Sequence, residues 1–270
     1  MNLLHISDLH FNSGSYSVEP HKIEEGLINL INHNKQSDKE FYLLVSGDIT
    51  TVGKSDGFNE AKTFFENIIK KTNIKKENFL VCPGNHDIST ESFKEFDKFS
   101  YGIRQDDKFT FEKNNSNLFI DNEKCFLSIN TSYHLDHKFG KIDIEQLSQL
   151  LKKHEKVIGS AKIKIIFFHH HLLNILDNDN SAIKNAYQFF HMINKYKFNF
   201  IFHGHQHARQ LFDINNIKIN TISALLDNRA SSNLVACYEF KENNIIKKEE
   251  YVYLKDEINE NGTSGSYKKI

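Results

Sequence analysis

The sequence predicts an α/β fold in which two sheets are layered on one another. Short apolar runs alternate with amphipathic helical stretches up to Phe202, and the chain opens in the order strand, helix, strand, helix, strand. That order implies parallel strands joined by right-handed crossovers, with helices covering the sheet. After Phe202 the pattern changes to short strands with little helix. We therefore expect a single domain over residues 1–258, built from two sheets.

The amino-terminal half contains the regular part of this pattern. The strands expected here are residues 3–7, 41–46 and 78–82, and the helices between them are residues 23–31 and 58–69. Pro83 and Gly84 stop the third strand, because proline has no N–H to donate and glycine favours turns. Residues 87–117 are less regular, and within them we expect only a short helix at residues 93–99.

The carboxyl-terminal half continues with two further helices and a series of strands. The expected helices are residues 144–151 and 182–196, and the expected strands are residues 124–130, 163–168, 198–202, 210–214, 217–222, 233–240 and 244–254. Residues 262–266 read Gly-Thr-Ser-Gly-Ser, a composition that favours a flexible chain. We therefore expect residues 259–270 to be a frayed tail.

Length and composition narrow the classes of function. The chain has 270 residues, of which 39% are hydrophobic and 26% charged, so it can build a sizeable core and disorder is not expected. Its 34 basic and 35 acidic residues give a formal net charge of -1. This balance argues against a globally basic nucleic-acid binder, although it is compatible with a local basic patch.

Cysteine usage and apolar run length bear on the cellular compartment. Cys82, Cys125 and Cys237 are an odd number and form no Cys-x-x-Cys motif, which excludes a disulfide framework and a cysteine-rich zinc site. No apolar run approaches the roughly 18 residues that span a bilayer. Residues 1–7 lack the basic and long apolar regions of a secretory signal. We expect a cytoplasmic protein with no membrane partner.

Residues that bind divalent metal ions follow five of the expected strands. Of the 15 histidines in the chain, eight occur in or beside these motifs. The five motifs are Asp8 with His10, Gly47 with Asp48, Gly84 to Asp87, His169 to His171, and Gly204 to His207. In an open α/β sheet the carboxyl ends of the strands form the site crevice, so we expect the five loops to converge on one place.

The side-chain types in these motifs suit a pair of divalent cations. Carboxylate oxygens, an amide oxygen and neutral imidazoles favour Zn, Mn, Fe or Ni over Ca or a thiolate site. Asp8 and His10 are alternate residues, as are His205 and His207, so each pair can reach one metal ion. Asp48 is a lone carboxylate that is placed to bridge. Two ions about 3.5 to 4 Å apart would clamp a phosphate and polarise a bridging water.

Each motif also has a plainer explanation when it is taken alone. Residues 47–48 and 84–87 have the composition of ordinary turns, and residues 169–171 could be core histidines that hydrogen-bond to the backbone. Ordinary turns do not explain why all five motifs occur together and why each follows a strand. Together, the five motifs therefore predict a metal-dependent active site.

This ordered set resembles the motifs of the calcineurin-like metallophosphoesterase superfamily, over about residues 1–225. The spacing and the helical segment 57–71 are similar to those of class III cyclic nucleotide phosphodiesterases and related small bacterial phosphodiesterases. The resemblance implies a four-layer αββα sandwich of two mixed sheets flanked by helices. It also implies two divalent metal ions, which would be Mn, Fe, Zn or Ni.

The resemblance further implies a set of metal ligands. Asp8, His10 and His207 would bind the first ion, Asn85, His205 and one histidine of residues 169–171 would bind the second, and Asp48 would bridge them. Family members usually have a His-His pair followed by proline, with the first histidine as the ligand, which points to His169. Here His171 stands where that proline would be, and His170 is the second choice.

Catalysis and substrate binding involve a few further residues. The family pattern gives His86 the catalytic role, as the acid to the leaving oxygen or as a donor to the transition-state phosphoryl group, and Asp87 would orient it through its other ring nitrogen. Arg209, shortly after the fifth motif, is the best placed cation for a phosphate oxygen, and Arg104 is a further candidate. An exposed, solvated side chain is the plainer alternative for each arginine. His170 is a weaker candidate for substrate contact.

The favoured function is a metal-dependent phosphodiesterase, in which a hydroxide activated by the two metal ions attacks the phosphorus atom. The expected substrate is a phosphate ester, more narrowly a small nucleotide such as a cyclic mononucleotide. A nuclease of the same superfamily is an alternative that the near-neutral charge does not favour, and a phosphomonoesterase is another. A non-catalytic scaffold of the same fold belongs to a different class, and the complete ligand set argues against it. The sequence is compatible with a homodimer.

Overall fold

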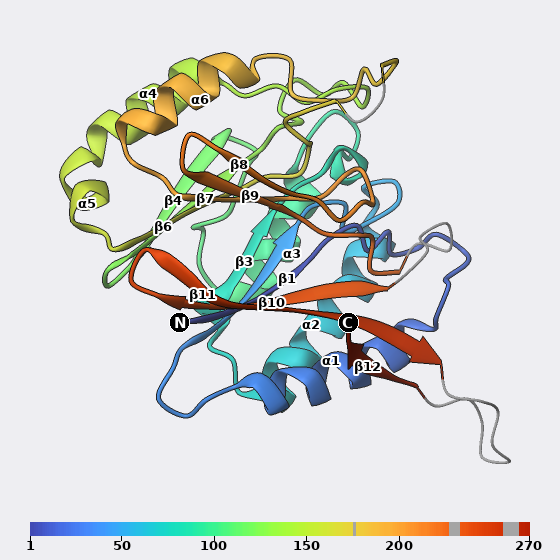
Figure 1. Ribbon diagram of the computed structural model, residues 1–270. Helices are drawn as coiled ribbons and strands as arrows, with labels where there is room; N and C mark the ends of the chain where they lie inside the picture. The colour runs from blue at the N-terminus through green and yellow to red at the C-terminus, as the bar shows by residue number, and fades with distance from the viewer. Residues whose placement is uncertain (175–176, 227–232, 256–264) are drawn as a thin grey trace, which may run out of the picture.

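The computed structural model describes residues 1–174, 177–226, 233–255 and 265–270. Within these residues the strands form two six-stranded sheets that are layered face to face, and helices cover their outer faces (Figure 1). Both sheets contain parallel and antiparallel pairs. The four-layer αββα sandwich of two mixed sheets is therefore confirmed.

The first sheet has the strand order β12-β11-β10-β1-β2-β3. Its strands are β1 (Asn2–Ile6), β2 (Phe41–Ser46), β3 (Phe79–Cys82), β10 (Leu234–Lys241), β11 (Asn244–Lys255) and β12 (Gly265–Lys269). β1, β2 and β3 pair in parallel, with Leu4 opposite Leu43 and Leu44 opposite Leu80. β10, β11 and β12 continue the sheet as antiparallel strands. The parallel part follows from the alternation of strands and helices at the start of the chain.

The second sheet has the strand order β4-β5-β6-β7-β9-β8. Its strands are β4 (Ser116–Asp121), β5 (Lys124–Ile129), β6 (Ile163–Phe167), β7 (Phe200–His203), β8 (Leu211–Ile214) and β9 (Ile217–Thr221). β5, β6, β7 and β9 are parallel, while β4 and β8 pair antiparallel at the two sides. Parallel strands in both sheets let loops from both reach the same edge of the sandwich.

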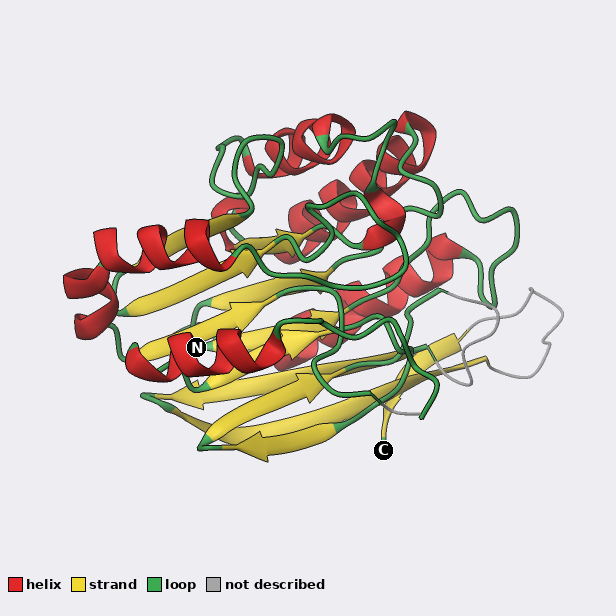
Figure 2. Ribbon diagram, turned by 90° about the horizontal axis from the view of Figure 1, so that it is seen from above, coloured by secondary structure: helices red, strands yellow, loops and turns green. Residues whose placement is uncertain are grey.

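Helices form the outer layers, above and below the two sheets in Figure 1, and Figure 2 shows the same helices in red, seen from above. They are α1 (Pro20–Asn34), α2 (Ser55–Thr72) and α3 (Lys94–Arg104) on the first sheet, and α4 (Ile144–Lys153), α5 (Glu155–Ser160) and α6 (Ala186–Lys195) on the second. Two short 3-10 helices, η1 (Lys76–Asn78) and η2 (Asn85–Asp87), flank β3. Among the described residues, the helices are too short or too polar to cross a membrane.

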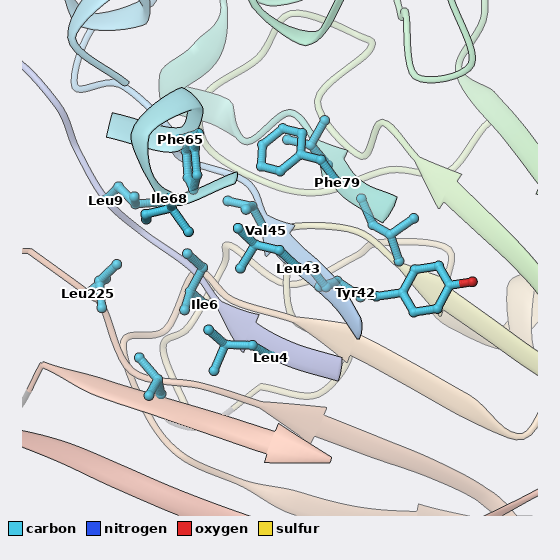
Figure 3. Packing of buried hydrophobic residues seen from close by; sticks show 14 of the residues in the cluster. Leu4, Ile6, Leu9, Tyr42, Leu43, Val45, Phe65, Ile68, Phe79 and Leu225 are labelled. Atoms are coloured by element: carbon cyan, nitrogen blue, oxygen red, sulfur yellow. The ribbon is translucent and has the colours of Figure 1, made fainter. Parts of the chain in front are cut away.

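The core lies between each sheet and its helices and also between the two sheets. Phe65 and Ile68 of α2 lie beside Val45 of β2 in the close view of the first sheet (Figure 3). Tyr42 comes from the same strand, and its ring packs on Phe126 of β5 in the other sheet, with ring centroids 5.0 Å apart. Because side chains alternate along a strand, β2 is buried on both faces. This explains why its sequence is a continuous apolar run.

Every strand expected from the sequence is present, within a few residues of its expected bounds, but the pattern does not predict β4, β12, α5, η1 and η2. β4 pairs with β5, and its apolar residues Leu118 and Ile120 are only half-buried, so its apolar signal is weak. α5 follows directly after α4. α6 begins at Ala186 and not at residue 182, because Ile183 pairs with Gly140 in an isolated bridge.

The expectation of a frayed tail is wrong for Gly265–Lys269, which form β12. This strand pairs antiparallel with β11, and Tyr267 lies opposite Tyr253 with ring centroids 5.4 Å apart. Such cross-strand aromatic pairs stabilise a sheet, and the Gly- and Ser-rich composition of this part of the chain conceals the strand. Residues 259–264 of the expected tail lie outside the described residues.

Candidate metal centre

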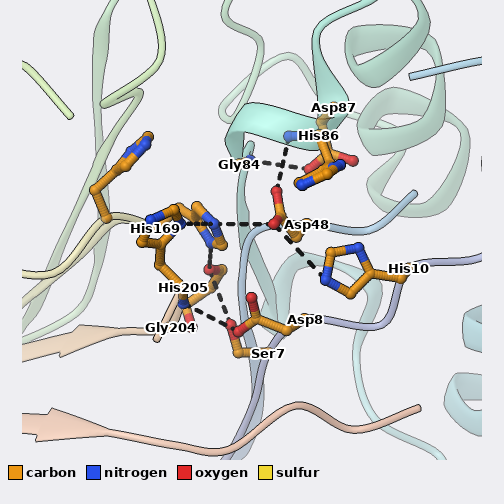
Figure 4. Close-up of polar contacts among 12 residues, drawn as sticks. Ser7, Asp8, His10, Asp48, Gly84, His86, Asp87, His169, Gly204 and His205 are labelled. Carbon is orange, nitrogen blue, oxygen red and sulfur yellow. Dashed lines mark hydrogen bonds and ion pairs between the residues drawn. The ribbon is translucent and has the colours of Figure 1, made fainter. Parts of the chain in front are cut away.

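The five motifs meet at the edge of the sandwich where the parallel strands end (Figure 4). The motifs follow β1, β2, β3, β6 and β7 in turn. Ligand atoms lie within 4.8 Å of one another in three overlapping groups, which are Asp8, His10 and His207, then His10, Asp48 and His86, and finally Asp48, His169 and His205. The predicted convergence of five loops on one place is therefore confirmed.

Asp48 lies between the histidines of two different groups. Its Oδ2 atom is 3.8 Å from His10 Nε2 and 3.1 Å from His169 Nε2. Its Oδ1 atom accepts a hydrogen bond of 2.9 Å from the backbone N–H of His86. The backbone thus fixes one oxygen, and the other oxygen faces histidines that come from different sheets. A carboxylate in this position can bridge two cations.

The backbone at this edge adopts a conformation that most residues avoid. Only a few per cent of non-glycine residues have a positive φ, and the conformation costs free energy that surrounding structure must offset. Five of the sequence-predicted ligands have it: Asp8 (φ 54°), His10 (φ 51°), Asp48 (φ 49°), His205 (φ 77°) and His207 (φ 49°). Strain of this kind concentrates at functional sites, where it aims side chains inward.

Gly204 and Gly84 allow the ligand loops to approach one another closely. A Cβ atom at Gly204 would collide with Ser7 Oγ and Asp8 Oδ2, and one at Gly84 would collide with Asp48 Oδ1. Both contacts would be far shorter than real Cβ contacts, so neither position accommodates a side chain without displacing a carboxylate. The glycines in these motifs therefore have a packing role in addition to a turn role.

The buried polar atoms of the centre fit bound cations. Asn85 Oδ1 is buried and has no hydrogen-bond donor among the described residues. Asp8 is also buried, and its Oδ1 lies 3.2 Å from His207 Nε2. A buried acceptor without a donor costs about 1–3 kcal/mol. Because amide and carboxylate oxygens are ligands of divalent cations, the donor set present here fits a metal pair.

Charges within the centre shift the pKa values of its side chains. Burial disfavours the charged carboxylate of Asp48, but His169 and His10 outweigh burial and hold its pKa well below the usual range. Burial also disfavours protonation of His169, but the Asp48 and Asp8 carboxylates outweigh it and raise the pKa of His169 to about 9. In the metal-free protein, a proton on His169 therefore supplies positive charge that a cation would otherwise supply.

The structure distinguishes the three consecutive histidines after β6. His169 Nε2 lies 3.1 Å from His205 Nδ1, and its Nδ1 donates to the backbone carbonyl of Ser46 at 2.9 Å. His170 Nδ1 lies 2.8 Å from the Thr131 hydroxyl, and His171 Nε2 donates to Asp179. Of the three, His169 is the one that joins a ligand group, which supports its choice over His170.

His86 is oriented by a different partner from the one that we expected. Its Nδ1 atom donates to the backbone carbonyl of Thr51 at 2.7 Å. The Asp87 carboxylate accepts backbone N–H groups from Gly84, Ile49 and Thr50, at 2.9, 3.1 and 2.9 Å. The prediction that Asp87 orients His86 through its ring nitrogen is therefore wrong. Asp87 holds the loops after β2 and β3 together, because a buried carboxylate needs several donors.

The candidate substrate residues have other partners. Arg209 is half-exposed, and its Nη2 lies 2.5 Å from Glu250 Oε2 on β11. Arg104 is buried, forms an ion pair of 2.8 Å with Asp106 and packs on aromatic rings of the core, so its predicted phosphate contact is wrong. His170 is fully buried, and this burial does not support a substrate contact. The structure thus brings the histidines and aspartates of the five motifs together.

Some partners of the centre carry no signal in the sequence. The carbonyls of Ser46 and Thr51 orient His169 and His86, and any residue type supplies a carbonyl. Asp179 lies in the irregular segment between β6 and α6, and does not directly follow a strand. A recurring motif in related sequences would have been needed to single it out.

Comparison with known proteins agrees with this geometry. The family model described as "Calcineurin-like phosphoesterase" matches residues 1–209, which is more than half of the chain. The "Uncharacterized metallophosphoesterase-like protein YydB" of Bacillus subtilis is 35% identical over 92 residues, covering 34% of this chain and 18% of that protein. The "Probable glycerophosphodiester phosphodiesterase GpdQ" of Arcobacter nitrofigilis is 27% identical over 174 residues, covering 63% and 57%. The chain thus spans less than two thirds of each relative.

Solved structures share the fold at low sequence identity. A dimetal phosphatase from Danio rerio has a TM-score of 0.65 at 10% identity, covering 100% of this chain and 98% of that chain. A putative 5′-nucleotidase from Staphylococcus aureus has a TM-score of 0.55 at 13% identity, covering 100% of this chain and 53% of that chain. At these identities the likeness concerns the fold alone. The match over residues 1–209 agrees with the sandwich and with the five converging motifs, and the chain belongs to the calcineurin-like phosphoesterase family.

Proposed function

We propose that this protein is a metal-dependent phosphodiesterase that hydrolyses a phosphate diester. The observation that carries the proposal is the position of Asp48, whose Oδ2 atom faces His10 at 3.8 Å and His169 at 3.1 Å. One shared carboxylate between two histidine groups is the arrangement that a pair of cations requires. When bound, such a pair polarises phosphoryl oxygens and lowers the pKa of the attacking water.

The protein's own residues divide into two ligand sets. Asp8, His10 and His207 would hold one cation, Asn85, His169 and His205 would hold the other, and Asp48 would be shared. The strained backbone and the close glycine contacts hold these side chains in place before any ligand binds. Preorganised groups of this kind favour catalysis because little reorganisation is needed during the reaction.

His86 is placed to transfer a proton. The Thr51 carbonyl accepts the hydrogen on Nδ1 at 2.7 Å, so the proton that moves is the one on Nε2. The imidazole is only half-buried, so a substrate can reach it. Protonation of the leaving oxygen by His86 would assist cleavage of the ester bond. Asp87 supports this step indirectly by fixing the loop that carries His86.

The substrate class rests on the relatives. The partial likeness to a probable glycerophosphodiester phosphodiesterase supports a diester over a monoester. The resemblance of the motifs to class III cyclic nucleotide phosphodiesterases supports a small nucleotide, such as a cyclic mononucleotide, as the narrower proposal. The neutral balance of charge in the chain does not favour a long nucleic acid.

The test is hydrolysis of bis(p-nitrophenyl) phosphate beside p-nitrophenyl phosphate by the Mn²⁺-loaded protein, with a chelator-treated sample as the control. We expect chelator-sensitive hydrolysis that is faster on the diester. Asp97→Asn is a matched control, because Asp97 also accepts backbone N–H groups but lies on α3, outside the ligand groups. Preference for the monoester would indicate a phosphatase. Inactivity on both esters with two ions bound would point to a narrow substrate or to a scaffold.

A further inference from the structure

A network of side chains adjoins the ligand group of His169 and His205. His171 Nε2 donates to Asp179 Oδ2 at 2.7 Å, and Gln206 donates to the same oxygen at 3.2 Å. The other Asp179 oxygen accepts the N–H and the hydroxyl of Ser181, at 2.9 and 2.7 Å. The network therefore joins the segment after β6 to the loop after β7.

The His171 ring lies flat against one of the ligand-type histidines. Its centroid is 5.3 Å from that of His205, and the two ring planes differ by 13°. The χ2 torsion of a histidine has a broad energy profile, so its rotamer alone does not fix the plane of the ring. A neighbouring ring that Asp179 holds in place restricts this torsion. His205 Nδ1 is thereby kept 3.1 Å from His169 Nε2.

The same network also holds the backbone of the ligand loop. His205 has a φ of 77°, a strained value for a residue with a side chain. The next residue, Gln206, donates through its side chain to Asp179 and Ser181. Through its backbone N–H, Gln206 donates to the Gly204 carbonyl at 3.0 Å. The His171 ring thus restrains the side chain of His205, and Gln206 restrains its backbone.

His171 and Asp179 have no direct access to a substrate. Their side chains are 1% and 8% exposed, and neither belongs to the three ligand groups. Their effect on the metal centre therefore passes through the His205 ring and through Gln206, which follows His205 in the chain.

We propose that His171, Asp179 and Gln206 are positioning residues that set the affinity for the cation held by Asn85, His169 and His205. The affinity for the cation held by Asp8, His10 and His207 does not depend on them. This inference rests on the proposed function, since it assumes a metal pair. Removing a group that orients a metal ligand typically weakens binding about 10- to 100-fold, and we expect an effect of this size at one cation only.

The experiment compares Mn²⁺ binding by the wild-type protein and by Asp179→Ala, using isothermal titration for affinity and electron paramagnetic resonance for pairing. We expect the wild type to show a spin-coupled pair at two equivalents of Mn²⁺. At the same loading, Asp179→Ala should show mainly isolated Mn²⁺, with one affinity unchanged and the other about 10- to 100-fold weaker. Asp179→Asn, which keeps one acceptor oxygen, should recover most of the affinity. Asp97→Ala is the matched control.

The outcomes separate this inference from the proposed function. A wild-type protein that binds no pair of ions would overturn both. A wild-type pair together with unchanged affinities in Asp179→Ala would overturn the inference alone. Equal weakening of both ions would also overturn it, because a general loss of structure does not select one cation. If Asp179→Ala does not fold, His171→Phe keeps the aromatic plane without the hydrogen bond and is expected to show the same selective loss at His205.

Discussion

The edge of the sandwich that carries the five motifs can be compared with the opposite edge, where the parallel strands begin. The opposite edge has a cavity of about 570 Å³ lined by lysines and glutamates. Its charges pair directly, with Lys39 2.7 Å from Glu239 and Lys162 2.7 Å from Glu123. At the motif edge, the carboxylates of Asp8 and Asp48 instead meet histidines and backbone N–H groups.

This difference in charged partners decides what each edge can bind. A lysine keeps its charge at neutral pH, so a carboxylate paired with lysine has no need of another cation. A histidine can release its proton and become a neutral ligand, which leaves the carboxylates free to bind a metal ion. A high density of charge therefore does not by itself indicate a metal centre. Carboxylates beside histidines indicate one, whereas carboxylates paired with lysines do not.

Asp48→Asn should have the largest effect on the motif edge. The substitution removes the one charged oxygen that faces both His10 and His169, so both cations should bind more weakly. We expect turnover of a diester to fall about 10³-fold, comparable with the loss of a principal electrostatic group. Elemental analysis of the purified variant checks the cause. One metal ion retained in full would contradict a shared ligand.

His86→Asn should separate chemistry from metal binding at the same edge. His86 is absent from the group of Asp8, His10 and His207. It is also absent from the group of Asp48, His169 and His205, so both cations should remain bound. We expect kcat to fall about 10²-fold or more, as for loss of a general acid. Steady-state kinetics with metal analysis tests this. Turnover equal to that of the wild type would refute the role of His86.

Lys124→Met should affect the opposite edge only. Lys124 is 13% exposed, and its Nζ lies 2.5 Å from Glu40 Oε2 and 3.1 Å from Asp121 Oδ2. Removing its charge takes the nearer cation from both carboxylates, while Glu40 keeps Lys75 at 3.5 Å and Asp121 keeps the Tyr42 hydroxyl, so we expect the free energy of unfolding to fall by about 1 kcal/mol. Urea denaturation measures the change. Lys98→Met, in the exposed pair with Glu95, is the control and should cost less than about 0.5 kcal/mol. A change in metal content of Lys124→Met would contradict the separation of the edges.

Raising the pH should strengthen metal binding at the motif edge, because a proton competes there with the metal ion. The pKa of His169 is about 9 in the metal-free protein, so at pH 7 the imidazole is protonated and metal binding must release that proton. Metal affinity should therefore rise about tenfold per pH unit from pH 7 and level off above pH 9. Calorimetry in buffers with different ionisation enthalpies counts the released protons. An affinity that does not change over this range would show that His169 carries no proton to displace.

Much of the centre can be predicted from the sequence, since strand and loop positions follow from local patterns. Asp8, Asp48 and His205 each come directly after an apolar run, and periodicity alone places them at the end of a strand. β12 was concealed because its stability comes from the ring of Tyr267 on Tyr253, a contact between strands that composition does not report. Arg104 was misplaced because a cation near a motif can equally well pair with an acid, in this case Asp106.

By itself, the sequence determined the layered α/β fold, the five strand ends and the donor types that suit a cation pair. Only the tertiary structure decided that His169 is the histidine that joins the ligand group, that Thr51 and not Asp87 orients His86, and that Asp179 lies against the His205 side of the centre. The physical reason is distance along the chain. Strand ends depend on neighbouring residues, whereas the partner of a buried side chain depends on which remote segment packs against it, as Ser46 does against His169.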